Sequence, residues 1–176
     1  METVICLSYH YPPFGGVAVQ RVLRFSRYFH EFGFRCVVIC AHPPKATSIP
    51  LDPQLLEDIP VQVEVHRLHT FEPECLHNHW SHPWDKIRRN FLKTFAAMLI
   101  PDDQALWIGP AARKAVELAQ RYRARALWAT GPPFSSLLAG VKASKVCGVP
   151  LVADFRDDWT GLGILQERLS PGRLKK

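Results

Sequence analysis

The sequence predicts an α/β protein with a mostly parallel sheet and helices on both of its faces. Short apolar runs with β-branched residues alternate along the chain with segments whose apolar residues recur at helical spacing. The run CVVICA at 36–41 is apolar throughout, as expected for a strand that is covered on both faces. Regular alternation of strand and helix indicates a Rossmann-like fold.

The first half of the chain begins with a predicted buried strand at 3–8. A helix is predicted over 17–32, because apolar residues recur there at helical spacing and arginines lie between them: Val22, Phe25, Phe29 and Phe32, with Arg21, Arg24 and Arg27 facing solvent. Gly33 is the expected stop of this helix. After the strand at 36–41, residues 61–68 alternate apolar and polar side chains, which predicts a strand with one wetter face.

The second half continues the alternation. Residues 86–100 (KIRRNFLKTFAAMLI) predict an amphipathic helix with a basic side, and Pro110 opens a helix over 111–122. A strand at 126–130, a helix at 137–147 that stops at Gly148 and a strand at 150–155 complete the predicted elements.

Composition fits one domain of a cytoplasmic protein. The 176 residues contain no apolar stretch near the roughly 18 to 20 that a membrane span requires, and the N-terminus has no basic segment of a secretory signal. Of five cysteines, none has C-x-x-C spacing, and Cys6, Cys36 and Cys40 are expected to be reduced core residues. The net charge of +6 suits an anionic ligand, nucleic acid or an anionic membrane without choosing among them.

Three unusual segments each follow a predicted strand: YHYPPFGG at 9–16, TGPPFSS at 130–136 and DFRDDW at 154–159. The carboxyl ends of parallel strands meet at one edge of a sheet, and this edge is where ligands bind in such folds. We therefore expect the three segments to converge there.

The first segment ends in two glycines directly before a helix. Gly15 and Gly16 can expose backbone N–H groups and the positive end of a helix dipole to an anion. Neither G-x-G-x-x-G nor a P-loop is present, and taken alone the pair is better explained as a tight turn.

The other two segments carry polar side chains. Ser135 or Ser136 is expected to cap the following helix, and no G-x-S-x-G pattern makes Ser135 a nucleophile. The third segment places carboxylates beside a cation, which suits hydroxyl or phosphate recognition, with a surface ion-pair cluster as the alternative: Asp154, Arg156, Asp157 and Asp158.

A loop rich in histidine and tryptophan precedes the basic segment. No cysteine or carboxylate stands at zinc-finger spacing from His77, His79 and His82, so no metal site is expected. Tryptophan followed by KIRRNFLK favours contact with a membrane interface.

Taken together, YPPFGGVAVQRVLRFSRYFHEFGF, TGPPFSS and GVPLVADFRDDW resemble the N-terminal half of a GT-B glycosyltransferase of the family 4 type. Many bacterial members have a similar P-P-x-x-G-G loop, a T-x-P-P-x-S segment and a D-F-R-D-P-W segment. The order and spacing agree from Val4 to Trp159.

The resemblance implies transfer of a sugar, with retention, from a nucleotide-sugar donor to a glycan or a polyprenyl-linked acceptor. It implies a domain at 1–160 with a basic tail at 161–176, no further cofactor and no nucleic-acid partner. Residues that it assigns to the donor diphosphate or the acceptor are Gly15, Gly16, Tyr11, Thr130, Ser135 and Asp154. Arg156 and Asp157 fall near the reacting sugar, as active-site candidates without an assigned acid or base role. The membrane-facing candidates, at the inner membrane face, are Trp80, Trp84, Lys86, Arg88 and Arg89.

Two departures from the family pattern matter. Asp158 stands where proline is usual, and the C-terminal domain that supplies the nucleotide pocket and a Glu-x7-Glu pair is not part of this sequence. Glu64 and Glu72 have that spacing, but they lie on a strand and loop of the wrong domain. We expect the chain to be inactive without a separate donor-binding domain. The alternative is a non-catalytic α/β module that binds an anionic or lipid-linked glycan; an oxidoreductase is disfavoured because the dinucleotide fingerprint is missing.

Overall fold

The structure, a computed structural model, describes residues 1–43, 50–69 and 99–157. Five strands form one sheet in the order β3-β2-β1-β4-β5, and every neighbouring pair is parallel. The strands are β1 (Glu2–Leu7), β2 (Phe34–Ala41), β3 (Glu64–Leu68), β4 (Ala126–Gly131) and β5 (Leu151–Phe155). The predicted α/β class with a parallel, Rossmann-like sheet is confirmed.

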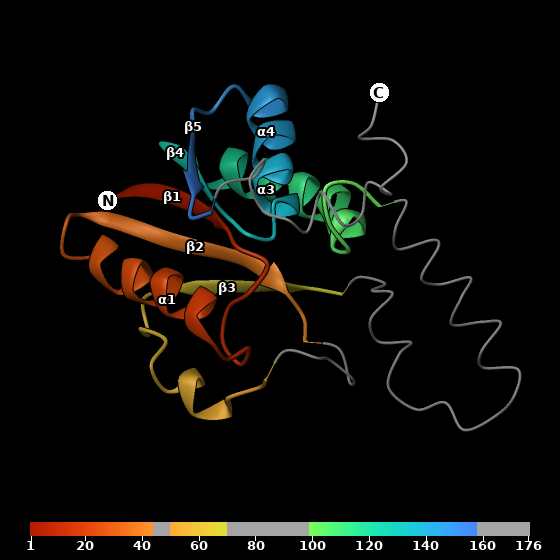
Figure 1. The fold of residues 1–176 in the computed structure, drawn as a ribbon. Coiled ribbons are helices and arrows are strands. Elements are labelled where there is room, and N and C mark those ends of the chain that lie inside the picture. The colour runs from red at the N-terminus through yellow and green to blue at the C-terminus, as the bar shows by residue number, and fades with distance from the viewer. Residues whose placement is uncertain (44–49, 70–98, 158–176) are drawn as a thin grey trace, which may run out of the picture.

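The helices cover both faces of this sheet, as Figure 1 shows. Helix α1 (Val17–Phe29) lies on one face, and α3 (Ile108–Tyr122) and α4 (Ser135–Cys147) lie on the other. Two short 3₁₀-helices, Pro53–Leu56 and Ala105–Trp107, complete the described elements. None of the helices in the described ranges is long and apolar enough to cross a membrane.

The centre of the core lies on β1 and β2, whose side chains are buried on both faces because helices cover both sides. Cys6, Cys36 and Cys40 are buried free thiols there, which confirms their prediction as core residues. Burial raises the pKa of Cys36 and of Cys40 to about 12, so both thiols stay protonated. The side chains of β1 and β2 thus act as a rigid support for the loops at the strand ends.

Helix α1 is shorter than predicted and turned about its axis. It ends at Phe29, and Phe32 beyond it is 75% exposed; Phe25 is 44% exposed and packs with its ring 5.0 Å from that of Trp128. The buried face consists instead of Val19, Val22, Leu23 and Ser26. This set has the same helical spacing as the aromatic one, and the smaller residues allow α1 to lie closer to the sheet. The three arginines of α1 are exposed as predicted.

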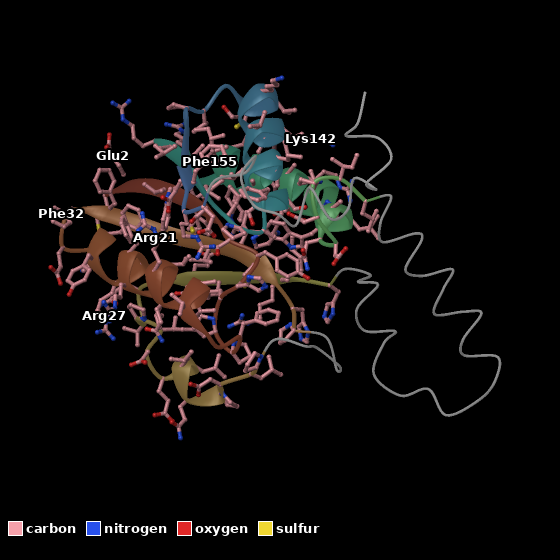
Figure 2. All side chains as sticks on the ribbon, in the orientation of Figure 1. Glu2, Arg21, Arg27, Phe32, Lys142 and Phe155 are labelled. Carbon is pink, nitrogen blue, oxygen red and sulfur yellow. The ribbon has the colours of Figure 1, made fainter. Side chains whose placement is uncertain are left out.

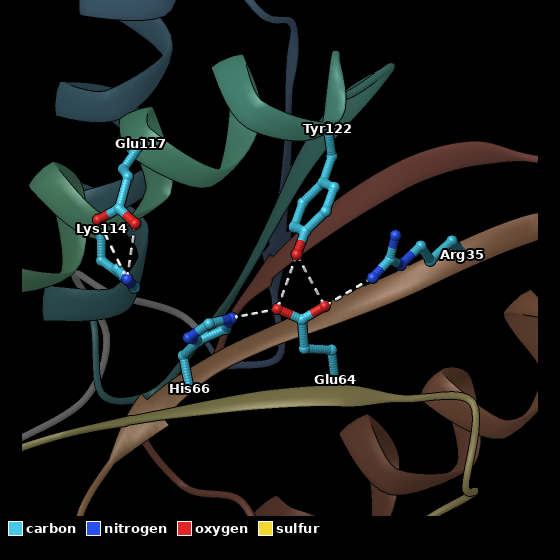
Figure 3. Close-up of polar contacts among 6 residues, drawn as sticks. All are labelled: Arg35, Glu64, His66, Lys114, Glu117 and Tyr122. Atoms are coloured by element: carbon cyan, nitrogen blue, oxygen red, sulfur yellow. Dashed lines mark hydrogen bonds and ion pairs between the residues drawn. The ribbon is translucent and has the colours of Figure 1, made fainter.

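The outer strand β3 is tied to the sheet and to α3 by one carboxylate (Figure 3). Glu64 contacts Arg35 Nη2 at 2.6 Å and His66 Nε2 at 2.6 Å, and it accepts a hydrogen bond from the Tyr122 hydroxyl at 3.0 Å. Every residue of β3 is half-buried, and the strand begins at Glu64 rather than at 61. Glu64 therefore has a structural role, which agrees with the rejection of a Glu-x7-Glu pair here.

Candidate functional site

Arg156 joins the segment after β5 to the segment after β4 and to the first turn of α1. Its Nε donates to the Gly131 carbonyl at 3.2 Å, its Nη1 donates to the Ala18 carbonyl at 3.0 Å, and its Nη2 donates to the Pro132 carbonyl. The Arg156 backbone N–H also donates to Gly131, at 3.1 Å. These bonds hold the end of β5 against the loop after β4 and the first turn of α1. The segment after β1 is joined to the segment after β4 by the Tyr9 N–H, which donates to Ser136 Oγ at 3.1 Å. The predicted convergence at the carboxyl edge is confirmed for the described residues.

Asp154 links β5 to α1. It accepts hydrogen bonds from Arg21 Nε and Nη2, both at 2.9 Å, and from the Thr130 hydroxyl at 2.9 Å. Burial raises the pKa of Asp154, but these bonds and the positive charges of Arg21 and Arg156 outweigh burial, so the pKa lies below its ordinary value. Asp154 is thus an ionised carboxylate whose oxygens already have partners.

The two glycines before α1 have different surroundings. Gly15 is buried and its N–H donates to the Pro50 carbonyl at 2.8 Å; a Cβ at this position would lie 3.1 Å from the same oxygen. Gly16 is exposed, with φ +88 and ψ 176, and a Cβ there would meet no atom within 4 Å. The first turn of α1 has no acidic residue and no capping side chain. Gly15 is therefore a turn residue, whereas Gly16 keeps the open backbone that an anion needs.

A groove of about 910 Å³ opens beside α1. We call it the α1–β5 groove; its lining residues are Val17, Ala18, Gln20, Arg21, Arg24, Phe25, Pro132, Phe155, Arg156 and Asp157. The Arg21 guanidinium carbon lies 5.2 Å from the centre of the Phe25 ring, and Figure 2 labels Arg21 on α1 and Phe155 at the end of β5. The groove combines cationic and aromatic side chains, as binding sites for polar ligands with apolar faces do.

Tyr11 and Thr130 were predicted to contact the ligands, and the structure places both side chains beneath the loops. The Tyr11 side chain is fully buried, and its hydroxyl is hydrogen-bonded to Ser26 Oγ at 2.9 Å. Thr130 is also fully buried and donates to Asp154. Both side chains are buried, and their hydrogen bonds stabilise the loops from beneath.

Ser135 is buried as well, and the prediction that a serine caps α4 is wrong. The residue before α4 is Phe134, without a side-chain cap bond. Ser135 is fully buried, and its backbone N–H donates to Asp102 Oδ2 at 3.0 Å while its hydroxyl donates to Asp102 Oδ1. A carboxylate from a distant loop therefore does the work of an N-cap.

His10 is a polar residue near Arg156 that the sequence analysis did not single out. Among the described residues, both of its ring nitrogens are buried without a hydrogen-bond partner, as are the Tyr9 hydroxyl and Trp107 Nε1. Burial, and then the positive charge of Arg156, lower the pKa of His10 to about 4, so the imidazole is neutral at neutral pH. The signal in the sequence was a polar residue directly after a buried strand, inside the YHYPPFGG segment.

Several predicted residues lie outside the described ranges. They are His77, His79, His82, Trp80, Trp84, Lys86, Arg88 and Arg89, together with Cys75, Asp158, Trp159 and the tail at 161–176. Within the described ranges, no group of three or more metal-ligating side chains comes together.

Comparison with solved structures shows a fold shared with a GT-B glycosyltransferase. The apo structure of UGT2 from Phytolacca americana has a TM-score of 0.50 at 16% identity, and its complex with UDP-2fluoro-glucose and pterostilbene has a TM-score of 0.51 at 15% identity. Each match covers 88% of this chain but only 29% and 30% of the UGT2 chains. At this identity the likeness concerns the fold.

A C-terminal domain of the PF1911 hydrogenase from Pyrococcus furiosus has a TM-score of 0.49 at 12% identity, over 86% of this chain and 90% of that one. No family model matches the sequence. No curated protein matches it either.

Proposed function

We propose that this chain is the N-terminal, acceptor-side domain of a retaining GT-B glycosyltransferase of the family 4 type. It would transfer a sugar from a nucleotide-sugar donor to a glycan or lipid-linked acceptor. One observation carries the proposal: at the carboxyl edge, Arg156 holds the end of β5 to the loop after β4 and to the first turn of α1 beside an open groove. Support comes from the fold shared with part of UGT2, which in one structure is complexed with a UDP-sugar analogue.

In this proposal the open backbone at Gly16 approaches the donor diphosphate. The uncapped first turn of α1 would place its positive end near the charge that develops on the leaving diphosphate. Gly15 supports this turn through its bond to Pro50. Arg156 and Asp157 border the groove and are proposed to lie near the reacting sugar.

The domain at 1–160 is proposed to need a separate donor-binding domain, with 161–176 as a basic tail. The matches cover only about 30% of the UGT2 chains, which is in keeping with a partner domain of this kind. We therefore expect no transfer by this chain alone.

A peripheral contact with the inner face of the membrane is proposed for the basic and aromatic residues Trp80, Trp84, Lys86, Arg88 and Arg89. Their support is chemical: arginine and lysine attract anionic headgroups, and tryptophan favours the interface. Salt-sensitive binding to anionic vesicles, absent for neutral ones, is the expected result in a flotation assay.

A non-catalytic glycan-binding module is the second candidate, and one observation favours it. Asp154, Arg21 and Thr130 satisfy one another, which leaves Asp157 as the carboxylate that lines the groove in the described part of the chain. Such a site binds a ligand well but offers few groups for proton transfer.

Reconstitution with a separately produced donor-binding domain distinguishes these candidates. Arg156→Lys and Asp157→Asn should lower turnover by about 100-fold or more, because the charges at the reacting sugar are lost or displaced. Arg113→Lys on α3, away from the groove, is the matched control and should keep wild-type turnover. Glycan binding without turnover, in the presence of the partner domain and a panel of nucleotide sugars, would favour the module.

A further inference from the structure

The α1–β5 groove has an excess of positive charge. Three arginines line it, Arg21, Arg24 and Arg156, and Asp157 is its one lining carboxylate in the described part of the chain. Asp154 pairs with Arg21 through two hydrogen bonds. Three positive charges less two negative ones leave a net charge of +1.

Arg24 is a groove cation on α1 that has no carboxylate partner among the described residues. Among the described residues it makes no ion pair, in contrast to Arg21 on the same helix and to Arg27, which lies 3.7 Å from Asp58. Arg24 is exposed and lines the groove, so its guanidinium can reach a ligand there.

Arg156 adds a second attraction for an anion. The hydrogen bonds of its guanidinium to Gly131, Ala18 and Pro132 all go to backbone carbonyls, which orient the group without neutralising it. Burial lowers the pKa of Arg156, which reflects a cation that is partly removed from water. A ligand anion in the groove would relieve this cost.

The groove also presents aromatic surface. Phe25 is 44% exposed and Phe155 is 55% exposed, and Pro132 also lines the groove. The C–H face of a pyranose ring is apolar and packs against such rings, while its hydroxyl groups remain free for polar contacts. The volume of about 910 Å³ is sufficient for a saccharide of more than one ring.

From these observations we infer that the α1–β5 groove holds the acceptor, and that this acceptor is a saccharide with a phosphate or carboxylate group bound by Arg24. This inference rests on the proposed function and names the substrate class of that site. The anion could belong to a soluble sugar phosphate or to a lipid-linked sugar, because both present the same group to Arg24.

Binding of glucose 1-phosphate to the full chain, measured by calorimetry, tests the inference. Glucose itself should bind at least about ten-fold more weakly than glucose 1-phosphate. Arg24→Gln should weaken the binding of glucose 1-phosphate by about ten-fold, which corresponds to about 1.4 kcal/mol. Arg27→Gln removes the same charge from the same helix outside the groove and should change binding less than about two-fold. Flotation with phosphatidylglycerol vesicles, compared with phosphatidylcholine vesicles, identifies a lipid source if Arg24→Gln reduces binding there as well.

Three results would overturn the inference: equal binding of glucose and glucose 1-phosphate, equal losses in the two arginine variants, or displacement of glucose 1-phosphate by UDP at similar concentrations. The last would place the donor in the groove. The binding data do not depend on turnover, so anion selectivity without any transfer in the reconstituted system would refute the proposed function alone. Full transfer to a neutral acceptor by Arg24→Gln would refute the inference alone.

Discussion

Acid should destabilise the protein through His10, and His10→Phe should remove this effect. The His10 ring nitrogens are buried and have no partner in the described part of the chain, and burial together with the charge of Arg156 lowers the pKa of His10 from 6.5 to about 4. In the unfolded chain the ordinary pKa applies, so between these two values the unfolded state binds the proton and the folded state does not. The stabilisation is complete above about pH 6.5 and is lost as the pH falls toward 4.

The size of this effect follows from the two pKa values. The difference between 6.5 and about 4, at 1.36 kcal/mol for each pH unit, corresponds to about 3 kcal/mol. About 2.5 kcal/mol of this should already be lost at a pH of about 4.5. Phenylalanine keeps an aromatic ring beside Phe14 and Tyr9 and buries no unpaired nitrogen, so the variant should be at least as stable as the wild type at neutral pH.

Urea unfolding between about pH 7 and pH 4.5 measures this difference. The free energy of unfolding of the wild type should fall relative to His10→Phe by about 2.5 kcal/mol across this range. Tyr9→Phe is the control, because it removes a neighbouring buried hydroxyl and leaves His10 in place. This variant should keep the wild-type pH dependence of the free energy of unfolding. Parallel curves for the wild type and His10→Phe would refute the reasoning.

Three further predictions concern packing, backbone strain and acid stability. Gly140→Ala should destabilise the protein by about 1 to 3 kcal/mol, because the new Cβ would lie 2.8 Å from the Ala129 Cβ. Gly109→Ala is the control, since no described atom would lie closer than 3.8 Å to its Cβ, and it should leave the melting temperature unchanged or raise it. Equal shifts of the melting temperature in the two variants would contradict this. Gly16→Val should cost about 1 to 3 kcal/mol of backbone strain and abolish transfer in the reconstituted enzyme; full activity would mean that the glycine serves only the turn. Burial raises the pKa of Glu64, but its hydrogen bonds and nearby charges lower the pKa further, so its stabilisation is present above the ordinary carboxyl pKa and is lost as the pH falls below it. Glu64→Gln should therefore flatten the acid end of the stability curve, and an unchanged acid slope would refute this role.

The sheet and its functional edge could be predicted because their signals are local. Apolar runs predict β1, β2 and β4. Once the strands are predicted, the order of elements also shows which segment follows each strand at the carboxyl edge. Parallel strands then require these segments to meet. Arg156 could be singled out in the same way, as a cation at a strand end.

Burial of the polar side chains could not be predicted, because their partners are distant in sequence. Tyr11 is bonded to Ser26, and Ser135 to Asp102, across 15 and 33 positions. A hydroxyl in a loop looks accessible until the partner that covers and satisfies it is known. The exposure of Phe25 was missed for a related reason: the smaller residues of α1 compete for the same helical spacing, and only packing decides between the two faces.

Sugar transfer by the purified chain, with and without a donor-binding domain, tests the central claim most directly. Product formation is followed by mass spectrometry with a panel of nucleotide sugars and a phosphorylated saccharide as the acceptor. The account predicts no product from the chain alone and product from the mixture. Turnover by the chain alone, or no transfer from any donor in the mixture, would contradict it.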